Sequence, residues 1–132
     1  MGIVRSSIRG LISVNVAMAT ALIASAVHAD PGEPQLRCGW FENPTPGNAS
    51  LTDKGGEWLI GIQGGHQADG DWPTFKPAQW VRTNHPTSYG HGCACMKVTV
   101  DAKEKLVLKI HSAAARPLSA CRNDRALKEP AN

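Results

Sequence analysis

Four cysteines constrain this chain more than any other feature, because two of them stand one residue apart. Cys93 and Cys95 flank Ala94, while Cys38 lies far upstream and Cys121 far downstream. An even number of cysteines in a small exported domain is typical of a disulfide framework. A bond between such close neighbours rarely meets disulfide geometry. Two pairings therefore stay open: Cys38–Cys93 with Cys95–Cys121, or Cys38–Cys95 with Cys93–Cys121.

The first 29 residues have the three parts of a secretory signal peptide. Two arginines precede a mostly apolar stretch at 11–26, and small residues, Val27 and Ala29, occupy the −3 and −1 positions of a cleavage site. The alternative is a membrane anchor, but the apolar stretch is short for a membrane span. We predict cleavage between Ala29 and Asp30, and export to the periplasm or the medium.

Cleavage would leave 103 of the 132 residues, with 12 basic and 11 acidic side chains and a net charge of +1. This mild charge does not favour nucleic acid as a partner, and no membrane attachment is expected after cleavage. A hydrophobic share of 42% argues against a disordered chain. A single domain of this size has a marginal core, so each disulfide could add about 3–4 kcal/mol of stability on the chain-entropy model.

Alternation of apolar and polar residues predicts a mostly β fold, a small disulfide-stapled antiparallel β domain. The four residues at 101–104, between two alternating segments, predict the loop of a C-terminal hairpin, and Pro117 predicts a short helical turn that continues to about Leu127. We expect a flexible leader at 30–36, one domain at 37–127 and a tail at 128–132. The predicted strands are 57–63, 79–83, 93–100 and 105–112.

The same alternation assigns faces to the two hairpin strands. Met96 and its neighbours at 98 and 100 should face the core, which places Cys93 and Cys95 on the opposite face. We therefore expect the segments that carry their disulfide partners to strap over the outer face. In the last strand, the pattern predicts that Leu106, Leu108 and Ile110 face the core.

Several short motifs resemble one bacterial family, the domain of unknown function 4087 family. They include RCGWF at 37–41, NPTPGN at 43–48, YGHGCAC at 89–95 and PLSACR at 117–122. The resemblance covers nearly all of the chain after the signal. It implies a small exported protein with this cysteine pattern, and it supplies no activity.

A turn-rich loop at 64–73 is the predicted binding site, because loops on a rigid scaffold often carry function. It combines glycines, acids, a histidine and a tryptophan that we expect to be exposed. We predict a monomeric, non-enzymatic binding module whose partner is an unknown envelope protein or a small ligand. The residues of this loop that we single out are Gly64, Gly65, His66, Asp69, Asp71 and Trp72.

The alternative function is metal or redox handling near the paired cysteines. His91, Cys93, Cys95 and Met96 offer soft ligands, but the C-x-C spacing differs from that of zinc sites. A small hydrolase is a third hypothesis, although no nucleophile-elbow motif is present. We assign no catalytic residue, no metal ligand and no cofactor.

Overall fold

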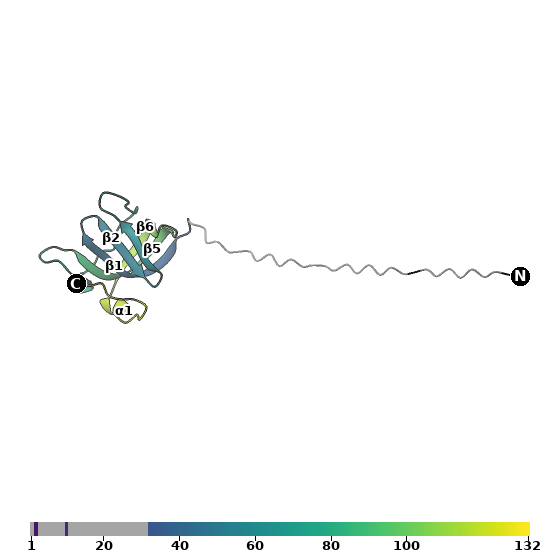
Figure 1. Cartoon of the computed structure of the whole chain (residues 1–132). Helices are drawn as coiled ribbons and strands as arrows, with labels where there is room; N and C mark the ends of the chain where they lie inside the picture. The colour runs from purple at the N-terminus through teal and green to yellow at the C-terminus, as the bar shows by residue number, and fades with distance from the viewer. Residues whose placement is uncertain (1, 3–9, 11–31) are drawn as a thin grey trace.

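A computed structural model describes residues 32–132 and, in the N-terminal segment, only Gly2 and Gly10. The predicted signal peptide and its cleavage site thus lie outside the described residues, apart from those two glycines. The described part forms a small β structure with a short helix at one side (Figure 1). Its elements are β1 (Gln35–Thr45), β2 (Asn48–Asp53), β3 (Gly56–Gly61), a 3-10 helix η1 (Pro77–Gln79), β4 (Trp80–Arg82), β5 (Gly90–Asp101), β6 (Leu106–Arg116) and α1 (Leu118–Arg122).

The strands form one mixed sheet that closes on itself. Its order is β1-β2-β3-β6-β5-β4, and β1 also pairs with β5. β5 is the long central strand: β1 lies along one edge, while β6 and then β4 share the other edge. Closure removes most of the free strand edges, which would otherwise invite pairing with other chains.

The ring is weakest between β3 and β6, which run parallel and share the single pair Leu59 and Leu106. The following segment fills the remaining gap. Asp69 pairs with Lys109 of β6, and the Ala68 N–H donates to the Ile60 carbonyl of β3 at 2.9 Å. With β4 left aside, this order of five strands with one parallel pair is the connectivity of the OB-fold, a partly open Greek-key barrel.

The barrel interior is a single apolar cluster. It draws on every strand except β4, and partly buried Trp72, Phe75 and Trp80 pack against its edge. Its buried members are Phe41, Ala49, Leu51, Trp58, Ile60, Ala94, Met96, Val98, Val100, Val107 and Ile110.

The prediction of a mostly β fold is confirmed, and all four predicted strands are present as β3, β4, β5 and β6. The sheet is mixed rather than purely antiparallel. The predicted hairpin loop is present, and the Asp101 carboxylate accepts the N–H groups of Lys103 and Glu104, each at 3.0 Å. The helical turn ends at Arg122, earlier than predicted.

The predicted core face of the last strand is correct at Ile110 and wrong at Leu108. The register between β5 and β6 shifts twice, between Lys97 and Val98 and again between Thr99 and Val100. Each shift is an irregularity that breaks the two-residue alternation. As a result Val107 and Ile110 are both buried, whereas Leu108 is 41% exposed.

The two disulfides are Cys38–Cys95 and Cys93–Cys121, which is the second of the two pairings that the sequence left open. The strap prediction holds for only one of them. Cys38 lies in the neighbouring strand β1, directly opposite Cys95, so that disulfide joins two strands within the sheet. Only the segment with Cys121 covers the outer face.

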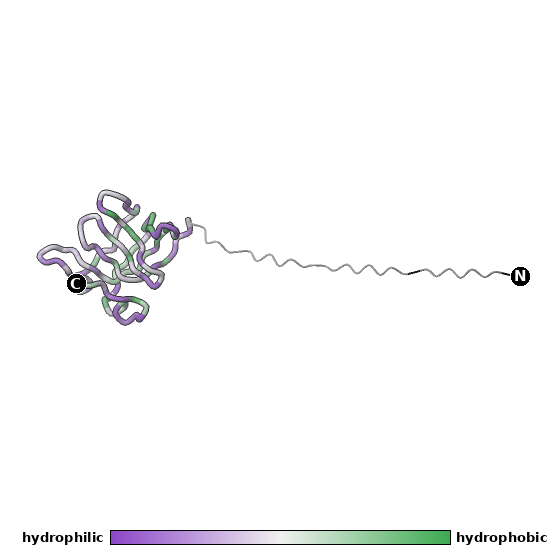
Figure 2. The backbone as a smooth tube through the Cα atoms, in the orientation of Figure 1, coloured by the Kyte–Doolittle hydropathy of each residue, from purple (hydrophilic) through white to green (hydrophobic). Residues whose placement is uncertain are grey.

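A second, smaller apolar cluster lies on that outer face. Trp40, Cys93 and Cys121 are fully buried there, and Leu118 and Leu127 pack against them. In Figure 2 the α1 region carries both hydrophobic and hydrophilic residues, as expected for a segment with one covered and one exposed side. The α1 segment thus supplies a second covered layer for β1 and β5.

Candidate ligand groove

The predicted binding loop at 64–73 is tied to the barrel by its backbone and by one histidine. The His66 Nε2 lies 2.7 Å from the Val107 carbonyl oxygen of β6. The Asp69 N–H donates to the Leu108 carbonyl at 3.0 Å, and the Asp69 carbonyl accepts the Ile110 N–H at 2.7 Å. Gly64 has a positive φ of 76°. These contacts give the loop a structural role in closing the ring.

Trp72 is less exposed than we predicted. It is half-buried, and its ring contacts the core residue Phe41 edge-on, with centroids 5.8 Å apart. Gly65 and Asp71 are exposed. A ligand role for this loop stays a prediction. His66 and the Asp69 backbone are engaged in contacts with β6.

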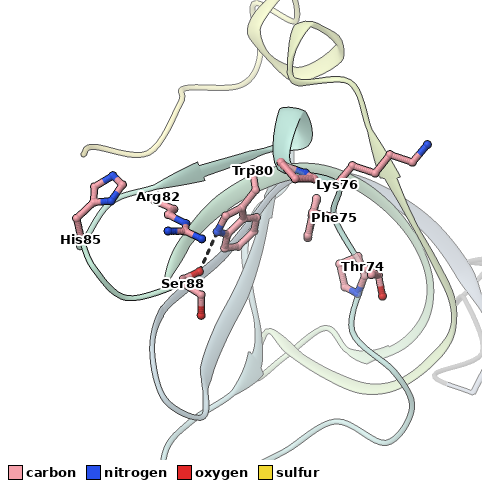
Figure 3. A pocket seen from close by; sticks show the side chains of 9 residues that line it. Thr74, Phe75, Lys76, Trp80, Arg82, His85 and Ser88 are labelled. Carbon is pink, nitrogen blue, oxygen red and sulfur yellow. Dashed lines mark hydrogen bonds between the residues drawn. The ribbon is translucent and has the colours of Figure 1, made fainter.

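The segment that follows this loop lines an open hollow. It is a groove of about 710 Å³ between the stretch that leads into η1 and the loop after β4 (Figure 3). The groove is open to solvent. It is lined by Pro73, Thr74, Phe75, Lys76, Pro77, Trp80, Arg82, His85 and Ser88.

Aromatic rings form one wall of this groove. The Phe75 and Trp80 centroids lie 4.8 Å apart, and both rings contact Phe41 of the core. The Trp80 Nε1 donates to the Ser88 carbonyl at 2.9 Å, as the dashed line in Figure 3 shows. The ring is therefore held by the core on one side and by the loop on the other, which fixes it in place before any ligand arrives.

The ionisable side chains that line the groove are all basic. Lys76, Arg82 and His85 are exposed, and no lining residue is acidic. Figure 3 shows Arg82 and His85 at the end of the groove near Ser88, with Lys76 at the other end. Such an arrangement offers flat apolar surface between two cationic ends, which suits an anionic ligand with an apolar centre.

Sequence reasoning found these residues only in part. Trp80 falls within the predicted strand 79–83 and packs against the core, but nothing in the pattern showed that it also faces a hollow. The lining residues all fall between 73 and 88, on both sides of β4 and within it. The signal that could have been used is the concentration of aromatic and basic residues at 75–85.

A cluster of ionisable side chains lies elsewhere, and it involves the C-terminal residues that we predicted as a tail. The Glu129 carboxylate accepts two hydrogen bonds from the Arg122 guanidinium, at 2.8 and 2.9 Å. It also lies 3.1 Å from Nε2 of His91, whose side chain is 1% exposed. Arg122 is the main cause that lowers the pKa of Glu129 to about 2, against the effect of burial, with His91 adding to the shift.

A second carboxylate stands beside this cluster. Glu42 of β1 lies opposite His91 of β5 in the ladder. Burial raises the pKa of Glu42, Glu57 raises it further, and His91 opposes both effects. The cluster as a whole fastens the end of the chain to β5.

The residues of the predicted metal or redox site do not share one environment. Met96 lies in the barrel core, whereas Cys93 lies in the outer cluster. All four cysteine sulfurs are in disulfides. Among residues 32–132, no group of three or more histidine, cysteine or acidic side chains is placed to hold a metal ion.

The fold and the groove define a small disulfide-linked β-barrel domain with an open aromatic and basic groove. Residues 33–128 match the model of a family described as "Protein of unknown function (DUF4087)". The chain belongs to this family, as its motifs indicated. Comparison with curated proteins and with solved structures gives no match. Within the described residues, no helix has the length and apolar character needed to cross a bilayer.

Proposed function

We propose that this protein is an exported binding module and that its groove holds an acidic segment of another envelope protein. The observation that carries the proposal is the open groove with an aromatic wall and only basic charged groups in its lining. An extended peptide with glutamates or aspartates on either side of a proline or aromatic residue would match both features.

The closed sheet supports a binding role because β4, which carries Trp80 and Arg82 of the groove, is paired with β5. A pre-formed site loses little conformational entropy when a ligand arrives. Phe75 and Trp80 supply flat surface that is already ordered by packing on Phe41. The aromatic wall is expected to contribute most of the affinity, as aromatic anchors do at protein interfaces.

The basic side chains would select the charge of the partner. Lys76 and Arg82 are exposed, so each adds modestly to affinity and more to the rate of encounter. Binding should therefore weaken as salt concentration rises.

The test uses two synthetic peptides and backbone NMR spectra of the purified protein. One peptide carries a Pro-Trp pair between glutamates, and the other carries lysines in place of the glutamates. We expect the acidic peptide to shift the signals of Phe75, Ser88 and the Trp80 indole, with a much smaller effect from the basic peptide. Arg82→Glu should weaken binding about threefold or more.

Lys103→Glu is the matched control, because Lys103 is an exposed lysine in the β5–β6 loop. It changes the net charge by the same amount and should leave binding unchanged. Equal binding of the two peptides, or unchanged groove signals with the acidic peptide, would contradict the proposal.

We propose export for two reasons. The N-terminus resembles a signal peptide, and the protein has two disulfides, which persist in oxidising compartments. Fractionation of the source cells should recover the protein outside the cytoplasm. Its N-terminal sequence should then begin at Asp30; an intact Met1 in the mature protein would overturn this part.

A further inference from the structure

The two disulfides differ in their exposure to solvent. Cys93 and Cys121 are 3% and 1% exposed, within the outer apolar cluster. Cys38 is exposed and Cys95 half-exposed. A dissolved thiolate can therefore approach the Cys38–Cys95 bond directly, whereas it must displace α1 to reach the other bond.

The two disulfides also differ in whether backbone pairing joins the segments that they connect. Cys38 and Cys95 lie opposite each other within nine consecutive residue pairs of β1 and β5. Opening that bond leaves the ladder in place. Cys121, by contrast, belongs to the five-residue helix α1, which has no strand pairing of its own.

A cation stands beside the exposed bond. One terminal nitrogen of the Arg116 guanidinium lies 4.0 Å from Sγ of Cys95. Arg116 also lines a hollow of about 160 Å³ that all four cysteines share. Lys97 projects on the same face as Cys95, and Asp124, which lines the hollow, opposes them with one negative charge. A nearby cation favours the thiolate over the thiol.

We propose that Cys38–Cys95 is a thiol-exchange site at which an external dithiol is oxidised. In the first step a thiolate of the dithiol attacks Sγ of Cys38, and the Cys95 thiolate leaves beside Arg116. In the second step the second thiolate of the dithiol attacks the first sulfur of the same dithiol molecule, which is bonded to Cys38. This closes the disulfide of the dithiol and releases Cys38 as a thiolate. Both cysteine thiolates then take up protons. The dithiol loses two electrons and becomes a disulfide, and Cys38–Cys95 gains them.

The test treats the oxidised protein with dithiothreitol at graded concentrations, alkylates the free thiols and locates the labels by mass spectrometry. We expect Cys38 and Cys95 to be labelled well before Cys93 and Cys121, while the circular dichroism spectrum stays native. With reduced glutathione in place of the dithiol, the mixed disulfide should form mainly on Cys38.

Arg116→Gln tests the role of the cation, because it removes the charge that favours the Cys95 thiolate. Arg116 is exposed, so we expect the first opening to slow about fivefold, as the loss of one charge at about 4 Å implies in bulk water. Lys109→Gln is the matched control and should have no effect. Lys109 is an exposed lysine of the same strand, but it pairs with Thr99, four residues from Cys95 along β5.

Three results would overturn the proposal: simultaneous opening of both disulfides, first opening of Cys93–Cys121, or an unchanged rate in Arg116→Gln. Unfolding after the first cleavage would appear as simultaneous opening, so it also counts against the proposal. The double variant Cys38→Ser/Cys95→Ser gives an independent check, since it should keep the native spectrum.

Discussion

Nε2 of His66 lies 2.7 Å from the carbonyl oxygen of Val107, and this contact joins the loop after β3 to β6 across the weakest seam of the barrel. β3 and β6 share only one residue pair, so the loop carries much of the closure. His66 was singled out as a candidate binding residue, but its position gives it a structural role.

We predict that His66→Ala lowers the free energy of unfolding by about 1 kcal/mol, the usual cost of one lost hydrogen bond. Urea denaturation followed by tryptophan fluorescence measures it. His85→Ala is the control, because His85 is exposed in the loop after β4. An effect of His66→Ala no larger than that of the control would show that the loop backbone alone closes the seam.

Gly39 of β1 has no room for a side chain. A Cβ at this position would overlap the Thr52 carbonyl oxygen of β2. Gly39→Ala must push β1 and β2 apart, so we predict a loss of about 1–3 kcal/mol of unfolding free energy. In Gly65→Ala the nearest atoms lie 3.7 Å from the added carbon, and the change should stay within about 0.5 kcal/mol. Equal melting temperatures for the two variants would refute this prediction.

Sequence reasoning missed β1 and β2, and in each of these strands three consecutive residues are buried. Trp40 and Phe41 are consecutive in β1 and point to opposite faces, yet both are buried. Phe41 faces the barrel core, and Trp40 lies under the cover that contains Cys121. A strand covered on both sides shows no alternation, so the pattern in 35–45 could not be recognised.

The candidate groove was hidden from the sequence for a different reason. Its lining lies within residues 73–88 and includes Trp80 and Arg82 of β4, but the shape that brings these side chains together depends on the pairing of β4 with the start of β5. The cysteine pairing was hidden in the same way. Alternation placed Cys93 and Cys95 on one face, but the register of β1 against β5 decided that Cys38 meets Cys95.

The Cys93–Cys121 disulfide should matter most for the C-terminal cover. In Cys93→Ser/Cys121→Ser, we expect α1 to detach and Trp40, now fully buried, to become accessible. The chain-entropy model gives a loss of about 3–4 kcal/mol for a loop of 28 residues. Quenching of tryptophan fluorescence by acrylamide should increase strongly. The same quenching as in Cys38→Ser/Cys95→Ser would show that α1 stays in place without its disulfide.

The anchor of the C-terminal residues should fail in acid. Arg122 holds the pKa of Glu129 at about 2 in the folded protein, below the ordinary value of 4.5. A lowered carboxyl pKa stabilises the fold fully above the ordinary value, and this contribution is lost as the pH falls towards 2. Glu129→Gln should therefore lower the melting temperature at pH 6 and make little difference near pH 2.

Glu104→Gln is the control for this pH series, because Glu104 is an exposed carboxylate in the β5–β6 loop. It should behave like the unmodified protein at every pH. The prediction rests on the two hydrogen bonds from Arg122 to Glu129, so Arg122→Gln should reproduce the effect of Glu129→Gln. If the gap between Glu129→Gln and the unmodified protein were the same at pH 2 and pH 6, the Glu129 carboxylate would not be what fastens the C-terminal residues to β5.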